Sequence, residues 1–294
     1  MRVERIEETV HGERGGVAAG DRGEAHATTQ IRITAPVLGV PIDVLDWARA
    51  IERIGRWAAA RDSRSIYLCN VHSVVTAMGD PAFARVLAGA DMATPDGAPI
   101  AWMLRRAGHV EQQRVDGPEL MLRLCQHAAE HRLPIALVGS THVTLARLQQ
   151  RLRASWPALR IVAVESPPFR PLTGTEEREL AARINASGAR IVFVGLGCPK
   201  QEKWIAARRG RIRAVMVGVG AAFDFHAGTA KRAPAWMRDH GLEWLHRLAS
   251  EPRRLWKRYA VTNTLFLIGA ARQLWAPQRR GKTSLKLRRA GETP

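Results

Sequence analysis

Five short apolar runs recur along the middle of the chain, and segments with helical periodicity separate them. The apolar runs lie at residues 65–69, 134–138, 160–164, 190–194 and 214–217. Strands that are buried on both faces of a parallel sheet have this composition, because helices cover both of their faces. Apolar residues at helical spacing occupy the segments 117–132, 141–155, 174–186 and 200–208. The alternation predicts an α/β fold with a Rossmann-like, doubly wound and mostly parallel sheet.

The pattern changes after about residue 231, where helical spacing continues without a further strand-like run. It predicts a basic helix over 253–259 and an apolar helix over 263–275. No run reaches ~18 consecutive apolar residues, so we expect no helix that spans a bilayer. The first 30 residues also lack the apolar run of a secretory signal. The resulting division is a disordered extension at 1–30, an α/β domain at 31–230, a helical appendage at 231–277 and a disordered basic tail at 278–294.

Charge is concentrated at the C-terminal end of the chain. The 294 residues carry a formal net charge of +18, and residues 231–294 contain 15 Lys and Arg against 4 Asp and Glu. Basic surfaces of this kind are typical of proteins that bind nucleic acid or anionic membranes, although solvated arginines without a partner are the alternative. The cysteines (Cys69, Cys125 and Cys198) form no CxxC pair, which favours a reducing compartment over disulfides or structural zinc.

Two polar residues follow predicted strand ends in the first half of the chain. The run 65–69 continues directly into Asn70, and Asp96 follows a short strand and precedes Gly97, which allows a tight turn. Ligands of open α/β sheets bind beyond the carboxyl ends of the strands, so both residues are candidates for a site. Asp96 has two interpretations: it caps the next helix, or it acts as a general base or a ribose contact.

The segment 194–204, VGLGCPKQEKW, joins a predicted strand to a predicted helix. Gly195 and Gly197 would let the backbone approach a ligand, and a helix N-terminus offers free N–H groups to an anion. Lys200 adds a positive charge for a phosphate, and Gln201 adds both donors and an acceptor. Because the sequence completes neither GxGxxG nor the P-loop pattern, an NAD or ATP site loses its main support.

Arg114 precedes another turn and could clamp a diphosphate with two hydrogen bonds, or it could be an ordinary surface arginine. A second glycine-rich strand end, at 217–225, has Asp224 and His226 close by. The chain contains no HExxH set and no Asp-x-Asp pair, which many sugar-nucleotide enzymes use to hold a metal on a diphosphate. If the substrate is a nucleotide sugar, cationic side chains and backbone N–H groups must stabilise the departing diphosphate.

Taken together, these segments resemble the WecG/TagA/CpsF family of bacterial glycosyltransferases, glycosyltransferase family 26. The matching stretches are YLCNVHSVV at 67–75, PDG at 95–97, RVDG at 114–117, GLGCPKQEKW at 195–204 and a long segment at 218–259. The resemblance covers roughly residues 35–275, and the order and spacing of five motifs make it far more specific than any single motif.

The resemblance implies an inverting hexosyltransferase that needs no metal or other cofactor. Its donor would be a UDP-sugar bound by the domain at 31–230, and its acceptor a sugar already attached to undecaprenyl diphosphate. Known members transfer N-acetylmannosamine, its uronic acid or glucose for teichoic acid linkage units, enterobacterial common antigen or exopolysaccharide. The implied location is cytoplasmic, on the inner face of the cytoplasmic membrane. The sequence leaves open whether the protein forms a homo-oligomer.

The resemblance also implies roles for individual residues. Asp96 matches the proposed general base, which takes the proton of the acceptor hydroxyl. Gln201 matches a glutamine proposed to contact the sugar or the diphosphate, and Asn70 and Arg114 match pocket residues. Many members carry Thr two residues before the Asn, where this chain has Leu68. The resemblance therefore does not assign the donor sugar.

In the family, the C-terminal appendage is thought to cover the active site and to meet the membrane. The arginines that would face the lipid diphosphate are Arg247, Arg253, Arg254 and Arg258. Helical spacing predicts three of them, Arg247, Arg254 and Arg258, on roughly one face. Four aromatic residues are candidate interfacial anchors, with ordinary core packing as the alternative: Trp244, Trp256, Phe266 and Trp275.

Two other classes of protein compete with this interpretation. A basic nucleic-acid-binding protein would explain the charge, but the sequence contains no zinc finger, RRM or KH pattern, so we expect no nucleic-acid partner. An NAD-dependent enzyme is disfavoured by the incomplete glycine fingerprint.

Overall fold

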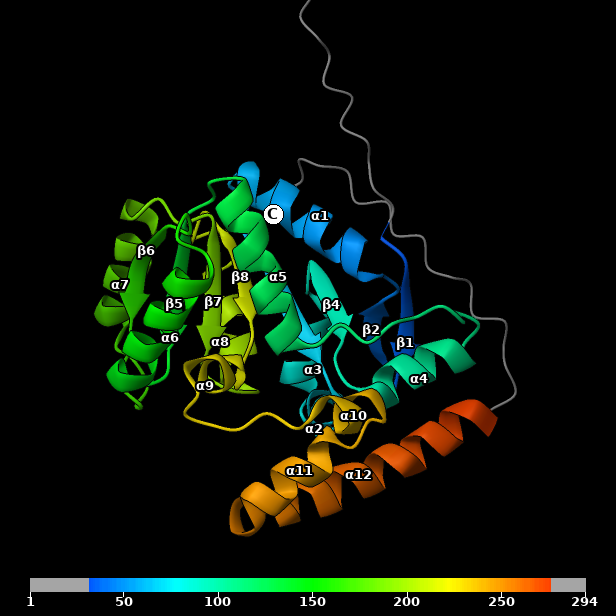
Figure 1. Cartoon of the computed structure of the whole chain (residues 1–294). Coiled ribbons are helices and arrows are strands. Elements are labelled where there is room, and N and C mark those ends of the chain that lie inside the picture. The colour runs from blue at the N-terminus through cyan, green and yellow to red at the C-terminus, as the bar shows by residue number, and fades with distance from the viewer. Residues whose placement is uncertain (1–31, 276–294) are drawn as a thin grey trace, which may run out of the picture. The chain divides into compact units, whose positions relative to one another are not determined.

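The computed structural model describes residues 32–275, and its centre is a six-stranded parallel sheet (Figure 1). The strand order is β4-β3-β8-β7-β5-β6. The strands are β3 (Arg64–Cys69), β4 (Met92–Pro95), β5 (Ile135–Gly139), β6 (Ile161–Glu165), β7 (Ile191–Gly195) and β8 (Val215–Gly218). The predicted α/β fold with a parallel sheet is therefore confirmed, and each of the five apolar runs forms a strand.

Helices cover both faces of this sheet, because alternate strand side chains point to opposite sides. Tyr67 and Val192 lie in one buried cluster, whereas their neighbours Ile66 and Ile191 lie in the other. The first face is covered by α2 (Val71–Gly79), α3 (Pro81–Ala88), α4 (Ala98–Arg106), α7 (Gly174–Ala186) and α8 (Lys200–Arg208). The second face is covered by α1 (Trp47–Ala59), α5 (Gly117–Glu130), α6 (His142–Ser155) and α9 (Ala222–Ala227). The sheet is thus doubly wound, as predicted.

An antiparallel hairpin that the sequence did not predict precedes α1. It consists of β1 (Thr34–Val37) and β2 (Val40–Asp43), and its inward side chains join the first buried cluster. Asp43 is 1% exposed, pairs with Arg32 at 2.7 Å and accepts a 2.7 Å hydrogen bond from the N–H of Ala93. This buried carboxylate ties the hairpin to β4.

Three further helices follow α9: α10 (Ala235–Asp239), α11 (Glu243–Ser250) and α12 (Pro252–Trp275). The prediction of two separate helices at 253–259 and 263–275 is wrong, because both segments belong to the single helix α12. No glycine or proline interrupts residues 253–268, and the Thr262 hydroxyl donates a 2.8 Å hydrogen bond to the Arg258 carbonyl, as helical Thr residues commonly do. Among the described residues, no helix is both long and apolar enough to cross a membrane.

Helix α12 packs on α2 and reaches the tip of the β1–β2 hairpin (Figure 1). The Gln273 side chain accepts a hydrogen bond from the Leu38 N–H and donates one to the Pro36 carbonyl, both at 2.8 Å. Gly269 lies against Leu38, because a Cβ at this glycine would be 2.8 Å from the Leu38 side chain. These contacts anchor the end of α12. The predicted extension at 1–30 and the tail at 278–294 lie outside the described residues, and the boundaries of the domains stay a prediction.

Candidate active site

The candidate site residues lie along one edge of the sheet, at the carboxyl ends of four adjacent strands. Asp96 follows β4, Asn70 follows β3, Gly220 lies just beyond β8, and the segment with Lys200 and Gln201 follows β7. Because these strands are parallel neighbours, their carboxyl ends meet at the same edge. Residues from four distant parts of the sequence are therefore brought to one place.

Asp96 occupies a tight turn that the backbone of the neighbouring strand fixes. Its N–H donates a 2.9 Å hydrogen bond to the carbonyl of Cys69, the last residue of β3. The N-cap of the following helix α4 is Gly97, with φ of 99°, and no side chain caps that helix. Capping therefore does not explain Asp96. Among the described residues, its Oδ2 accepts one hydrogen bond, at 3.3 Å from the Asn70 amide, and its Oδ1 accepts none.

Asn70 is oriented by the helix that it begins. Its Oδ1 accepts a 3.2 Å hydrogen bond from the Ser73 N–H, and the Ser73 hydroxyl accepts a 2.8 Å hydrogen bond from the Asn70 N–H. This capping box at the start of α2 holds the Asn70 side chain in one rotamer. With its oxygen occupied, the amide nitrogen is turned towards Asp96. Asn70 thus positions the carboxylate and stabilises its charged form.

The electrostatic surroundings of Asp96 favour the protonated acid more than water does. Burial raises its pKa to about 6, the positive charge of Arg114 opposes this rise, and the negative charges of Asp116 and Glu243 add to it. A carboxylate whose pKa lies near the working pH is suited to general-base chemistry. These surroundings are compatible with a proton acceptor, and the role of Asp96 as the general base stays a prediction.

Arg114 is not a surface arginine. Its side chain is 21% exposed, and its Nη2 pairs with the Glu243 carboxylate at the start of α11. Its Nη1 donates a 3.5 Å hydrogen bond to the Arg238 carbonyl, whereas its buried Nε has no hydrogen-bond partner among the described residues. The part that the sequence assigned to Arg114, a contact with the diphosphate, stays a prediction.

The two glycines after β7 have different surroundings. A Cβ at Gly195 would be 2.7 Å from the Phe223 ring, so close packing explains why this position is glycine. A Cβ at Gly197, where φ is 78°, would meet nothing within 4 Å. Lys200 is exposed beside it, at the first residue of α8. The backbone at Gly197 therefore borders open space, whereas the backbone at Gly195 does not.

Gln201 is 4% exposed and joins the ends of β7 and β8. Its Oε1 accepts a 3.0 Å hydrogen bond from the Gly220 N–H, and its Nε2 donates a 2.8 Å hydrogen bond to Glu202. Burial raises the pKa of Glu202, which is 1% exposed. Glu202 is a residue that the sequence analysis missed, although it stands next to Gln201 in the quoted motif. It fixes the orientation of the Gln201 amide.

Three predicted arginines approach the sheet edge from two different helices. Arg247 lies on α11, and Arg254 and Arg258 lie on α12, so the predicted single helical face is wrong because the helix breaks at Glu251. The packing of α11 on α12 nevertheless brings the three charges close enough to influence one another. Burial raises the pKa of Asp224, and the positive charges of Arg247 and Arg254 oppose this rise. The fourth candidate, Arg253, is exposed on α12.

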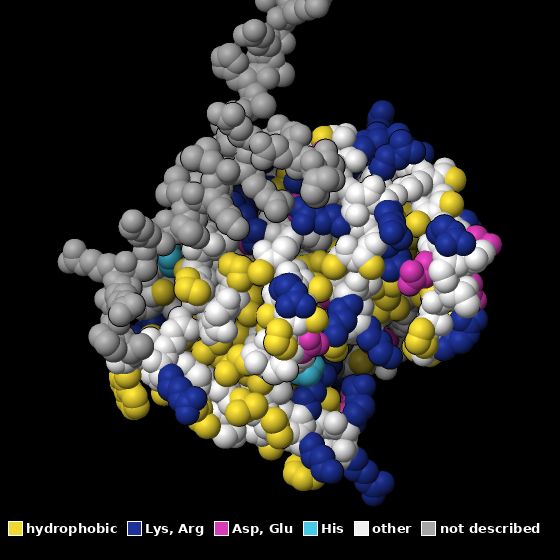
Figure 2. All heavy atoms as spheres, turned by 180° about the vertical axis from the view of Figure 1, so that it is seen from behind, with side chains coloured by type: hydrophobic (Ala, Val, Ile, Leu, Met, Phe, Trp, Pro, Cys, Tyr) yellow, Lys and Arg dark blue, Asp and Glu magenta, His cyan; other side chains and the backbone are white. Residues whose placement is uncertain are grey.

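The candidate membrane anchors divide into exposed and packed residues. Phe266 is 4% exposed and belongs to the buried core, so for this residue the packing alternative is correct. Trp256 and Trp275 are 54% and 85% exposed, and Trp244 is partly exposed against the Tyr259 ring. On the face shown in Figure 2, hydrophobic side chains gather across the lower part, with Lys and Arg side chains among them.

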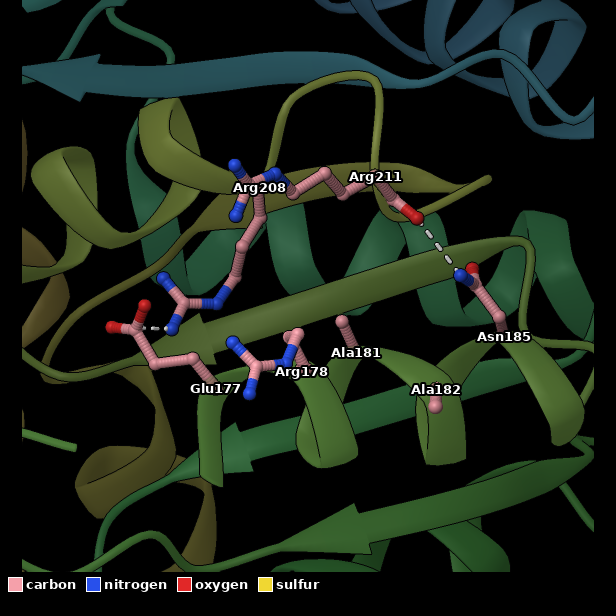
Figure 3. A pocket seen from close by; sticks show the side chains of 7 residues that line it. All are labelled: Glu177, Arg178, Ala181, Ala182, Asn185, Arg208 and Arg211. Carbon is pink, nitrogen blue, oxygen red and sulfur yellow. Dashed lines mark hydrogen bonds and ion pairs between the residues drawn. The ribbon is translucent and has the colours of Figure 1, made fainter. Parts of the chain in front are cut away.

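A separate small cavity of about 260 Å³ is lined by side chains of α7, of α8 and of the loop that follows α8 (Figure 3). It is lined by Glu177, Arg178, Ala181, Ala182, Asn185, Arg208 and Arg211, none of which is a candidate site residue. The Arg208 guanidinium in it already pairs with Glu177 at 3.0 Å. In the described part of the chain, no group of three or more His, Cys, Asp or Glu residues could hold a metal ion.

The fold and the site together define an α/β protein with a carboxylate at the carboxyl edge of its sheet and basic helices beside it. The model of the glycosyl transferase WecG/TagA/CpsF family matches residues 35–280. The chain therefore belongs to this family, and membership implies a glycosyltransferase of polysaccharide biosynthesis.

Proposed function

We propose that the protein is an inverting, metal-independent hexosyltransferase. It moves an N-acetylmannosamine-type or glucosyl group from a UDP-sugar to a sugar attached to undecaprenyl diphosphate. The family match supports transfer of a sugar. The observation that carries the mechanism is the Asp96 carboxylate. Asn70 holds one of its oxygens, the other accepts no hydrogen bond from residues 32–275, and the surroundings raise its pKa.

In the proposed reaction, Asp96 takes the proton of the acceptor hydroxyl as the hydroxyl oxygen attacks the anomeric carbon. The attack comes from the side opposite UDP, so the configuration inverts. The bond between the anomeric carbon and the diphosphate oxygen breaks, and its electron pair leaves with UDP. A positioned general base contributes ~10²–10⁴-fold to such a step.

The departing diphosphate needs positive charge and N–H donors. The turn at Gly197 offers open space, and Lys200 is exposed beside it at the N-terminal end of α8. Arg114 supplies positive charge on the Asp96 side, and its Nε lacks a hydrogen-bond partner among the described residues. Positively charged side chains and N–H donors of this type can stabilise a departing diphosphate without a metal ion.

The acceptor carries its own diphosphate, and we assign it to the basic helices. Arg247, Arg254 and Arg258 supply converging positive charge, and Trp256 and Trp275 are exposed on the same helix as two of them. Near an anionic leaflet each basic residue is worth ~1 kcal/mol, so several suffice for reversible binding. We therefore propose a peripheral location on the inner face of the cytoplasmic membrane.

The test is a screen for UDP release by the purified full-length protein. A panel of UDP-sugars is combined with a short-chain lipid-diphosphate-linked sugar, with and without EDTA. We expect one donor to give UDP only in the presence of the acceptor, at a rate that EDTA does not change. Absence of release with every donor would reject the function, and a loss of activity in EDTA would reject metal independence.

A further inference from the structure

Four charged side chains form a closed ring beside Asp96. Asp116 pairs with Arg232 at 2.6 Å, Arg232 with Glu243 at 3.8 Å, Glu243 with Arg114, and Arg114 with Asp116 at 3.8 Å. Asp116 and Arg114 belong to the turn before α5, whereas Glu243 is the first residue of α11, 129 positions from Arg114. The ring therefore links the C-terminal helices to the turn that faces Asp96.

The ring is largely withdrawn from water. The four side chains are between 12% and 21% exposed. Charges in such surroundings interact more strongly than surface charges, and removing one partner leaves the other uncompensated. Two cations and two anions balance within the ring, so Asp96 next to it is the uncompensated fifth charge. A change in the charge of Glu243 therefore changes the pKa of Asp96.

We propose that Glu243 is a positioning residue: by pairing with Arg114, it holds this guanidinium in the ring, so that Asp96 faces a charge-compensated arginine only while α11 is docked. This inference rests on the proposed function, because it concerns the general base of the transfer reaction. It assigns to the C-terminal helices an electrostatic part in catalysis, in addition to any contact with the acceptor.

Among the described residues, charged and polar groups from four parts of the fold act on Asp96. They are Asn70 at the N-cap of α2, the Cys69 thiol of β3, Arg114 and Asp116 of the turn before α5, and Glu243 of α11. Arg232 acts on them through Asp116 and Glu243. Of the two arginines, Arg114 is the one whose charge lowers the pKa of Asp96, and Glu243 opposes it. Loss of the Glu243 charge leaves Asp116 as the remaining acidic partner of Arg114 in the ring, so Arg114 stabilises the Asp96 carboxylate more strongly and weakens it as a base.

The experiment compares pH–rate profiles of acceptor-dependent UDP release for the wild-type protein, Glu243→Gln, Glu243→Asp and Asp239→Asn. Asp239 is the matched control, since it is an exposed acidic residue of α10 for which the structure gives no partner among the described residues. We expect Glu243→Gln to shift the acid limb of kcat to lower pH by about half a unit or more and to lower the plateau ~3–10-fold. Glu243→Asp keeps the negative charge, so its acid limb and its plateau should both stay close to those of the wild-type protein. Asp239→Asn should match the wild-type profile.

Three outcomes separate the possibilities. A lower plateau in Glu243→Gln with an unmoved acid limb would overturn the proposal, because a merely structural role of Glu243 predicts that result. An acid limb that moves equally in Asp239→Asn would also overturn it, because the effect would then reflect net charge. Absence of transfer by the wild-type protein would instead reject the proposed function. To exclude misfolding, UDP affinity and the urea unfolding midpoint of each variant are measured beside the profiles.

Discussion

Asp96 lies in surroundings that disfavour its negative charge and so raise its pKa. The turn between β4 and α4 fixes its backbone, the Asn70 amide holds one oxygen, and burial outweighs the attraction of Arg114. A carboxylate in this state costs folding free energy at neutral pH. In the proposed mechanism the same raised pKa makes Asp96 a better proton acceptor, so we expect folding stability and activity to oppose each other at this residue.

Replacing Asp96 by Asn should stabilise the folded protein at neutral pH. Because the pKa of Asp96 rises from 3.8 to about 6 on folding, its favourable contribution is present below pH ~4 and is lost as the pH rises through ~6. We expect Asp96→Asn to raise the free energy of unfolding by about 1–3 kcal/mol at pH ~7.5 and by almost nothing at pH ~4. Urea titrations at the two pH values measure the difference, with Asp239→Asn as the control. An equal effect at both pH values would contradict the burial argument.

Replacing Gln201 by Ala should destabilise the protein through two buried partners. The Gly220 N–H would lose its acceptor and Glu202 would lose its donor. Leaving such groups unsatisfied costs about 1–3 kcal/mol, which a urea titration resolves. Lys200→Ala is the matched control, because Lys200 is exposed next to Gln201, and it should leave the unfolding midpoint unchanged while raising KM for the donor. Equal midpoints for Gln201→Ala and the wild-type protein would show that these hydrogen bonds contribute nothing.

At the scale of single residues, the sequence identified the groups on strand ends but not their partners. Asn70 and Asp96 could be predicted because each directly follows a strand of one parallel sheet. Glu243 and Arg232 could not, because their pairing with Arg114 and Asp116 depends on how a distant helix docks. The spacing of charges in the sequence contains no signal for such a contact.

At the scale of elements, apolar runs and helical spacing predicted the core of the sheet closely. Predicted helices such as 174–186 and 200–208 have the observed bounds. The β1–β2 hairpin was missed because its strands have only four residues each, too few to show a period. The break predicted inside α12 was wrong because Thr262 and Asn263 are weak helix formers that tertiary packing overrides.

The end of α12 should loosen when its hydrogen bonds to the hairpin are removed. Gln273→Ala loses two hydrogen bonds to backbone groups of Leu38 and Pro36, each worth about 0.5–1.5 kcal/mol. We expect faster amide hydrogen exchange across residues 263–275 and unchanged exchange in β5 and β7. Arg272→Ala, an exposed change in the same turn, should have no such effect. Faster exchange throughout the sheet would instead mean that α12 supports the whole fold.

At the scale of the whole molecule, the positive charge and the exposed apolar side chains occur on the same helices. Leu267, Ile268 and Trp256 are exposed on α12, which also carries Arg253, Arg254 and Arg258. Positive charge alone does not distinguish a membrane-binding surface from a nucleic-acid-binding surface, but binding to a phosphate backbone does not require exposed aliphatic side chains. The combination favours an anionic lipid surface.

We predict salt-dependent binding of the full chain to vesicles that contain phosphatidylglycerol. Trp256→Ser combined with Leu267→Ser should weaken co-sedimentation about tenfold or more, because both side chains would insert into the interface. Phe169→Ser is the control, since Phe169 is 82% exposed but lies on the loop before α7. Tight binding to DNA with no binding to vesicles would support the nucleic-acid alternative instead.

The measurement that decides the mechanism is acceptor-dependent UDP release by Asp96→Asn and by the wild-type protein, with UDP affinity determined for both by calorimetry. If Asp96 is the base, the variant loses ~10²–10⁴-fold in kcat while its affinity for UDP stays within about twofold of the wild-type value. Wild-type turnover in the variant, at the same UDP affinity, would show that another group accepts the proton.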